Sequence, residues 1–222
     1  MVPAPSHVIL RILNRYSVRG HSGIPIDGGT IGLIDRRRFT GLTLAALAMG
    51  PVAAAAQTAR KLNEDGLYVE DWFVQSFLNL ADDLTDAGDT GKRLAILWEL
   101  EGCPYCKETH LVNLARPDIL AYLQANFAIL QLNMAGSRLV TDFDGEKMSE
   151  HKLARKWGVR YSPTVMFMPE AADATRNGRA LEVARMPGYF RPPHFFAMFR
   201  YVRENAYRTT DFRSYLRAAR KG

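Results

Sequence analysis

The sequence LAILWELEGCPYC, residues 94–106, places two cysteines directly after a short apolar run. With one exception residues 94–100 are apolar, and polar residues bound them, a pattern typical of a buried strand. Pro104 suits the first position of a helix, where its missing N–H is not needed and its fixed φ matches the helix. The segment therefore predicts a strand that leads into a helix, with Cys103 at the junction and Cys106 in the first turn.

The two cysteines are spaced for reversible disulfide exchange. Cys103 lies at the helix N-cap, where unpaired N–H groups and the positive end of the helix dipole favour a thiolate. Cys106 follows on the same helix face, with Cβ atoms about 5–6 Å apart, and a small closure would allow a bond. We expect a thiol–disulfide oxidoreductase in which Cys103 is the nucleophile, Cys106 the resolving cysteine, and no cofactor is needed.

Three other interpretations of Cys103 and Cys106 stay open on this reasoning. A static disulfide across so small a loop would constrain the unfolded chain little. A metal carrier would use both cysteines with His110, four residues after Cys106, but this set lacks a fourth ligand. The pair could also have no chemical role. Redox exchange is favoured, and the sequence predicts no metal site.

Helical and strand patterns alternate along the rest of the chain. Apolar spacing predicts helices at residues 70–84, 104–115, 119–124, 150–157, 192–205 and 211–219, and strands at 94–100, 127–132, 165–168 and 180–186. Ser149 is expected to cap its helix, with Glu150 facing solvent. Residues 136–148 are polar and predict an excursion with a small hairpin. The alternation indicates an α/β domain with a mixed sheet between helices.

A second motif, YSPTVMFM at residues 161–168, puts Pro163 at the start of a strand, where a proline need not donate a hydrogen bond. With the CxxC at a strand-to-helix junction and the elements between the two motifs, the chain resembles the thioredoxin superfamily. The resemblance implies a thioredoxin-like fold, in which helices flank a central mixed sheet and the polar excursion precedes the third core helix.

The same resemblance assigns roles around the cysteines. It implies a cis peptide bond at Ser162-Pro163, packed beside the two sulfur atoms. We expect Ser162 and Pro163, together with Pro104 and Tyr105, to bind a substrate segment, with main-chain hydrogen bonds as in strand addition.

The chain departs from the thioredoxin pattern before the nucleophile. Thioredoxins usually carry a buried aspartate six residues before the first cysteine, where it assists proton transfer from the second. Leu97 occupies that position here. Glu99 is nearby and is a candidate proton acceptor, although a carboxylate there is also typical of a solvated strand end.

Further motifs resemble the exported thioredoxins of bacterial sulfur-oxidation (Sox) gene clusters, the SoxW type. They are FDG at residues 143–145, KWGVR at 156–160, RMPGY at 185–189, HF at 194–195 and MFRY at 198–201. The resemblance implies that the protein reduces disulfides of periplasmic proteins, with a sulfur-carrier protein as the client. A membrane electron donor of the CcdA/SoxV kind would supply the electrons. A thiol oxidant of the Dsb kind, which runs the exchange in reverse, is the alternative.

The first quarter of the chain has the pattern of a cleavable export signal. The basic cluster RRRF at residues 36–39 precedes the apolar run at 42–49, and AAA at 54–56 offers a cleavage site. A membrane-spanning helix needs about 20 apolar residues, and this apolar run is shorter. The basic cluster also resembles the twin-arginine motif. We predict an N-terminal extension and signal at residues 1–56, a thioredoxin-like domain at 57–222, and a periplasmic location; a buried alanine-rich helix or a membrane anchor is the alternative.

Composition is consistent with this division. Of the 222 residues, 47% are hydrophobic and 23% charged, as in globular proteins. The net charge is +6, but residues 1–56 hold six basic and two acidic residues, which leaves only +2 for the rest and does not support nucleic-acid binding. Two cysteines are too few for a disulfide-dense scaffold or a four-cysteine zinc site. Because both belong to one motif, they argue against a disulfide-linked dimer but bear on no other kind of association; a monomer is the expectation.

Overall fold

The computed structural model describes residues 61–171 and 175–219. The predicted extension and export signal, residues 1–56, lie outside the described residues. In chain order the elements are α1 (Leu80–Asp89), β1 (Arg93–Glu99), α2 (Pro104–Glu108), the π-helical turn η1 (Thr109–Asn113), α3 (Pro117–Asn126), β2 (Phe127–Asn133), β3 (Leu139–Thr141), β4 (Lys147–Ser149), α4 (Glu150–Lys156), β5 (Thr164–Phe167), α5 (Gly178–Leu181), β6 (Ala184–Pro187), α6 (Pro192–Arg203), the short 3-10 turn η2 (Ala206–Arg208) and α7 (Phe212–Ala219). No helix within these two ranges has both the length and the apolar character that crossing a bilayer would require.

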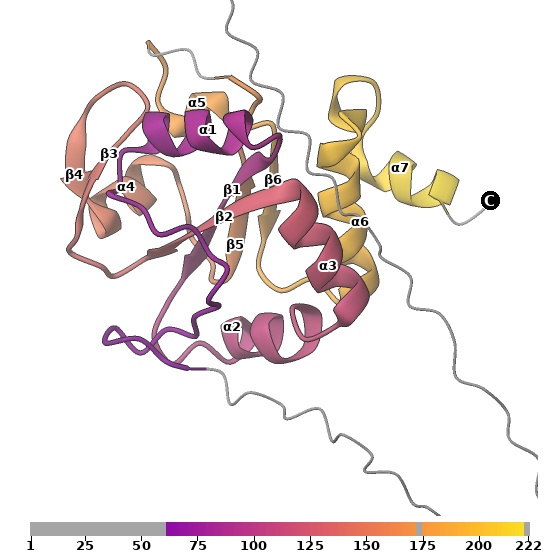
Figure 1. Cartoon of the computed structure of the whole chain (residues 1–222), viewed down its shortest axis with the longest axis horizontal. Coiled ribbons are helices and arrows are strands. Elements are labelled where there is room, and N and C mark those ends of the chain that lie inside the picture. The colour runs from indigo at the N-terminus through magenta and orange to yellow at the C-terminus, as the bar shows by residue number, and fades with distance from the viewer. Residues whose placement is uncertain (1–60, 172–174, 220–222) are drawn as a thin grey trace, which may run out of the picture. The chain divides into compact units, whose positions relative to one another are not determined.

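Four strands form a mixed sheet in the order β2-β1-β5-β6 (Figure 1). β1 pairs in parallel with β2 and antiparallel with β5, and β6 pairs antiparallel with β5. Every residue of β1 is buried, as expected for a central strand with helices on both faces. Helices α1 and α4 pack on one face of the sheet, and α3 and α6 on the other. The predicted α/β class, a central mixed sheet flanked by helices, is confirmed.

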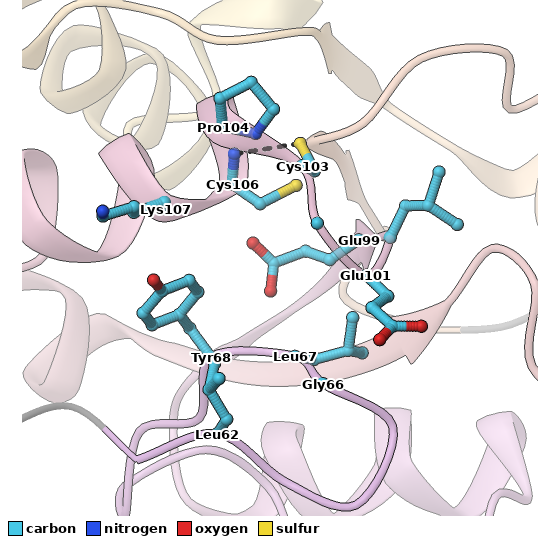
Figure 2. A pocket seen from close by; sticks show the side chains of 12 residues that line it. Leu62, Gly66, Leu67, Tyr68, Glu99, Glu101, Cys103, Pro104, Cys106 and Lys107 are labelled. Carbon is cyan, nitrogen blue, oxygen red and sulfur yellow. Dashed lines mark hydrogen bonds between the residues drawn. The ribbon is translucent and has the colours of Figure 1, made fainter.

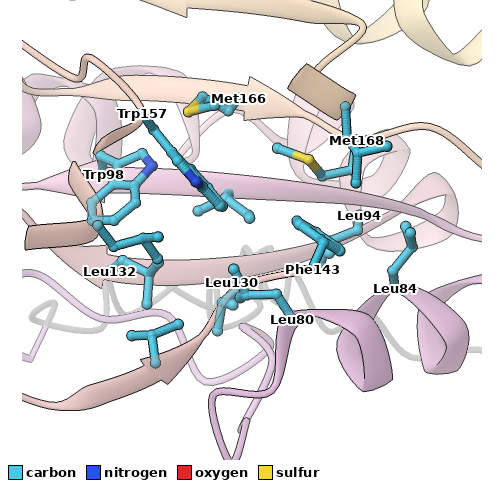
Figure 3. Packing of buried hydrophobic residues seen from close by; sticks show 14 of the residues in the cluster. Leu80, Leu84, Leu94, Trp98, Leu130, Leu132, Phe143, Trp157, Met166 and Met168 are labelled. Carbon is cyan, nitrogen blue, oxygen red and sulfur yellow. The ribbon is translucent and has the colours of Figure 1, made fainter. Parts of the chain in front are cut away.

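Alternate side chains of β1 enter two separate cores. Leu94 and Trp98 face the core beneath α1 and α4, whereas Leu97 faces the core beneath α3 and α6. In the first core, Trp98 and Trp157 meet edge to face with ring centroids 5.8 Å apart (Figure 3). Such an aromatic pair contributes about 1 kcal/mol beyond the area it buries. By the same alternation Glu99, the last residue of β1, points to the side on which α2 and η1 lie.

The polar excursion predicted at residues 136–148 is present as the β3–β4 hairpin. Asp142 anchors it to the domain, because its buried carboxylate accepts hydrogen bonds from Trp157 Nε1 at 3.0 Å and from the Gly178 N–H at 2.9 Å. Lys156 Nζ lies 2.8 Å from the same carboxylate. The excursion is therefore tied into the core next to Trp157.

The helix predicted at residues 70–84 is wrong over residues 70–79, since α1 begins only at Leu80. The preceding segment runs beside β2, where the Val74 N–H donates to the Ile129 carbonyl at 2.9 Å. Phe77, which helical spacing placed on the buried face, is fully exposed, and Leu78 has φ of 61°. This hydrogen bond holds the segment at the edge of the sheet, and apolar spacing alone does not distinguish such a segment from a helix.

The strand predicted at residues 180–186 is only half correct. Its first residues belong to α5, and β6 begins at Ala184. The Asn177 side chain accepts a hydrogen bond from the Ala180 N–H at 3.1 Å, which is the N-cap interaction that starts a helix.

Two side-chain predictions at α4 are also wrong. Ser149 occupies the N-cap position, but its hydroxyl bonds His151 Nδ1 at 3.1 Å and caps no backbone N–H. Glu150 is fully buried instead of facing solvent. Its carboxylate accepts hydrogen bonds from the Asn133 N–H at 2.8 Å and from Arg138. These two donors stabilise the carboxylate in its buried position.

Candidate active site

The junction of β1 and α2 places Cys103 at one end of the sheet. Gly102 has φ of +69°, a backbone conformation that residues with a side chain rarely adopt, so the turn from strand to helix needs glycine here. Cys103 is the N-cap of α2 and Pro104 its first residue. The Cys106 N–H donates to Cys103 Sγ at 3.1 Å, an interaction that strengthens when the sulfur is a thiolate. The local sequence thus presents a stabilised sulfur at the helix start.

The two cysteines, both free thiols, differ in exposure. Cys103 is half-buried, whereas only 2% of Cys106 is exposed. Burial raises the pKa of the Cys106 thiol, and the negative charge of Glu99 and the contact with Cys103 raise it further. Cys106 is therefore protonated at neutral pH and Cys103 is the accessible sulfur, a division that suits a resolving cysteine and a nucleophile.

The loop before β5 lies beside Cys103. The Ser162–Pro163 peptide bond is cis, the conformation that the sequence resemblance implied. Cys103 Sγ donates a hydrogen bond to the Ser162 carbonyl at 3.5 Å. Pro163 is buried, and its carbonyl accepts a hydrogen bond from the Gly188 N–H at 2.7 Å, which ties this loop to the end of β6. The antiparallel pairing of β1 with β5 brings these two distant parts of the chain together.

Two exposed tyrosines belong to the segments that meet at Cys103, one to the CxxC motif and one to the loop before β5. Tyr105, inside the CxxC, is 58% exposed and stacks on Tyr189 with ring centroids 6.0 Å apart. Tyr161, directly before Ser162, is 64% exposed. Exposed aromatic residues of this kind are common where a protein contacts a partner, so the surface around Cys103 is suited to receive a polypeptide.

A pocket of about 450 Å³ is lined by both cysteines (Figure 2). Its walls are the N-terminal segment at residues 62–68 and the chain from Glu99 to Lys107. Leu67 and Tyr68 lie opposite Cys106 in this pocket. The sequence offered no signal for this wall, because the segment is held by an isolated bridge between Leu62 and Tyr68 and has no regular periodicity.

Glu99 belongs to a group of ionisable side chains, Glu70, His110 and Glu99, which we call the Glu-His-Glu cluster. His110 Nε2 lies 3.1 Å from Glu99 Oε2, and His110 Nδ1 lies 2.8 Å from Glu70 Oε1. Glu99 and His110 are completely buried, so the alternative of a solvated strand end for Glu99 is wrong. Burial alone lowers the pKa of His110, but the hydrogen bonds and charges of Glu70 and Glu99 outweigh it and raise this pKa to about 9.

Sequence reasoning missed most of this cluster. It considered His110 only as a metal ligand with Cys103 and Cys106, and it gave Glu70 no role. In the described parts of the chain no three histidine, cysteine, aspartate or glutamate side chains are grouped so that they could hold a metal ion. Because both nitrogens of His110 face carboxylates, the geometry does not support the metal-carrier alternative.

Comparison with known families gives a match to the thioredoxin-like domain over residues 80–203. Comparison with curated proteins gives no match. Among solved structures, a thioredoxin-fold protein from Helicobacter pylori is 19% identical, with a TM-score of 0.44 over 58% of this chain and 84% of that one. A thioredoxin from Thermus thermophilus is 23% identical, with a TM-score of 0.42 over 56% of this chain and 83% of the other.

A third solved structure is the reduced C-terminal domain of DsbD from Neisseria meningitidis. It is 14% identical, with a TM-score of 0.37 over 55% of this chain and 90% of that domain. The family match spans more than half of the chain, from the start of α1 to the end of α6. It supports a thiol–disulfide oxidoreductase activity in general terms. With its fold, its cis-proline loop and its paired thiols at the end of β1, the chain belongs to the thioredoxin-like domain family.

Proposed function

We propose that this protein is an exported thiol–disulfide oxidoreductase that reduces disulfides of periplasmic proteins through Cys103 and Cys106. The observation that carries the proposal is the pairing of an accessible sulfur with a buried one. Cys103 accepts a hydrogen bond from the Cys106 N–H and contacts the Ser162 carbonyl, while Cys106 is closed off from solvent behind it.

The first step uses Cys103 as the nucleophile. A client segment lies along the loop at Ser162 and Pro163 and over the Tyr105 ring, with main-chain hydrogen bonds to the loop. The Cys103 thiolate attacks one sulfur of the client disulfide, a new S–S bond forms, and the other client sulfur leaves as a thiolate. The product is a mixed disulfide between the client and Cys103.

The second step needs a base, because Cys106 is protonated when the mixed disulfide forms. Glu99 supplies it from the wall of the pocket that Cys106 also lines (Figure 2). As Glu99 takes the proton, the Cys106 sulfur attacks Cys103 Sγ and the reduced client leaves with its second thiolate. A Glu99→Gln variant should therefore resolve the mixed disulfide about 100-fold more slowly, a typical loss for a general base.

Two cysteine variants test the proposal. In an insulin-reduction turbidity assay with a dithiol reductant, the wild type should be active and Cys103→Ser inactive. Cys106→Ser should accumulate client proteins as mixed disulfides that a reductant releases. Cys103→Ser is the control for this trapping, because it retains a thiol but lacks the nucleophile. Equal activity of the wild type and both serine variants would end the proposal.

The direction of electron flow in this proposal rests on the SoxW-like motifs. On this basis the client is a sulfur-carrier protein whose cysteine needs reduction, and a membrane donor of the CcdA/SoxV kind restores the dithiol. A redox titration distinguishes this from the Dsb-like oxidant. A reduction potential of about −270 mV, as in thioredoxin, supports the reductant, and one of about −120 mV, as in DsbA, supports the oxidant.

Export is part of the proposal and rests on the basic and apolar pattern of residues 1–56. We expect the full chain to be cleaved near residue 56 and recovered from the periplasm of a host with a twin-arginine pathway. Replacing Arg36 and Arg37 by lysine should retain the precursor in the cytoplasm. An uncleaved wild-type chain inside the cell would refute export without bearing on the thiol chemistry.

A further inference from the structure

The Glu-His-Glu cluster connects the redox pocket to a second pocket. Glu99 lines the first pocket together with both cysteines. Glu70 lines another pocket of about 220 Å³, whose wall residues do not overlap with those of the first. His110 lies between the two carboxylates and is itself completely buried. The cluster therefore forms a continuous hydrogen-bonded path from the redox pocket to a different opening.

Within the described residues, one oxygen of the cluster is left without a partner. Glu99 Oε2 is bonded to His110 Nε2 and to Gln131 Nε2, whereas Glu99 Oε1 is buried and has no hydrogen-bond partner there. An unpaired buried carboxylate oxygen is costly. Figure 2 shows the Glu99 carboxyl group directed into the pocket below the Cys106 sulfur. Glu99 Oε1 is thus the free acceptor at the redox end of the path.

We propose that His110 and Glu70 form a proton relay that carries to solvent the proton released when Cys106 resolves the mixed disulfide. This inference rests on the proposed function, because it extends the step in which Glu99 is the base. Glu99 is then the catalytic residue that meets the reacting thiol, and His110 and Glu70 are positioning residues that act through it.

The proton count of the relay balances. With His110 protonated, both ring nitrogens donate, and the cluster holds two carboxylates and one imidazolium. When the Cys106 S–H bond breaks, its proton bonds to Glu99 Oε1. His110 then releases its Nδ1 proton to Glu70, and water in the second pocket takes it from there. The cluster has the same net charge before and after, so no additional charge is left buried, which would be unfavourable.

The surroundings of His110 favour this role. Glu70 lies two residues after the N-terminal segment 62–68 and Glu99 ends β1, while Cys106 precedes His110 by one helical turn. The Tyr68 ring lies 5.6 Å from the imidazole and is a further titratable side chain beside it. A pKa of about 9 keeps His110 protonated at neutral pH, and part of that rise comes from the negative charge of Glu99. When Glu99 takes the Cys106 proton this charge disappears, and His110 holds its own proton less tightly.

The test separates the two chemical steps. The reduced full chain is mixed in stopped flow with the chromogenic disulfide dithiobis(nitrobenzoate), and the release of the coloured thiolate is followed. Attack by Cys103 releases one coloured thiolate in a phase that depends on reagent concentration. Resolution by Cys106 releases the second in a phase that does not. A Glu70→Gln variant should leave the first phase unchanged and slow the second about tenfold, because the relay loses its outlet. Asp71→Asn is the matched control, with the same loss of charge on the adjacent exposed residue.

The pH profile of the second phase distinguishes a relay from a structural contact. In the wild type this phase should change little between about pH 6 and 8. In Glu70→Gln it should accelerate with pH, because hydroxide must then collect the proton. Equal slowing of both phases, or a second phase identical to the wild type in rate and pH profile, would overturn the relay alone. Release of only one thiolate by the wild type would overturn the proposed function as well.

Discussion

Replacing His110 with glutamine should remove a large part of the pH dependence of stability. The pKa of His110 is about 9 in the folded chain against an ordinary value of 6.5. The folded state therefore binds this proton more tightly, and the protonated ring stabilises the fold fully below pH 6.5. That contribution is lost as the pH rises from 6.5 through about 9. At about 1.4 kcal/mol for each tenfold difference in proton affinity, the loss is about 3 kcal/mol.

The assay is urea unfolding, followed by tryptophan fluorescence, at several pH values between 6 and 9.5. The wild type should lose about 3 kcal/mol of unfolding free energy across this interval, whereas His110→Gln should start less stable and change little. His194→Gln is the control, because His194 is exposed and its variant should follow the wild type. An NMR titration of the wild-type imidazole gives an independent value. A midpoint near 6.5, or equal pH dependence in the wild type and His110→Gln, would refute the reasoning.

Three further predictions concern packing and charge. An alanine at position 178 would place its Cβ in overlap with the buried Trp157 ring, so Gly178→Ala should lower the unfolding free energy by about 2 kcal/mol. Gly88→Ala is the control and should not lower it, because a Cβ at position 88 has its nearest neighbouring atom 3.9 Å away. Asp142→Ala leaves buried N–H donors without an acceptor and should cost about 3 kcal/mol in the same urea assay. Glu99→Gln removes a negative charge that raises the pKa of the resolving thiol, so pH-dependent alkylation should show a lower pKa, although resolution becomes slower.

The redox motif could be predicted because its structure is locally encoded. An apolar run, a cysteine at the N-cap and a proline at the first helical position all favour the same strand-to-helix junction. The segment at residues 70–79 could not be predicted in this way. Its apolar spacing is compatible with a helix, and only the hydrogen bond to β2 shows that it runs along the sheet.

The sequence by itself therefore determined the position of the two cysteines at a strand-to-helix junction and the α/β alternation around them, since each depends on residues close together in the chain. Only the tertiary structure decided which groups serve those sulfur atoms. Glu70 is 40 residues from His110 in the chain, and Glu99 could have been a solvated strand end. A carboxylate becomes a buried base only when folding removes its water and supplies a partner, and both changes come from segments that are distant in sequence.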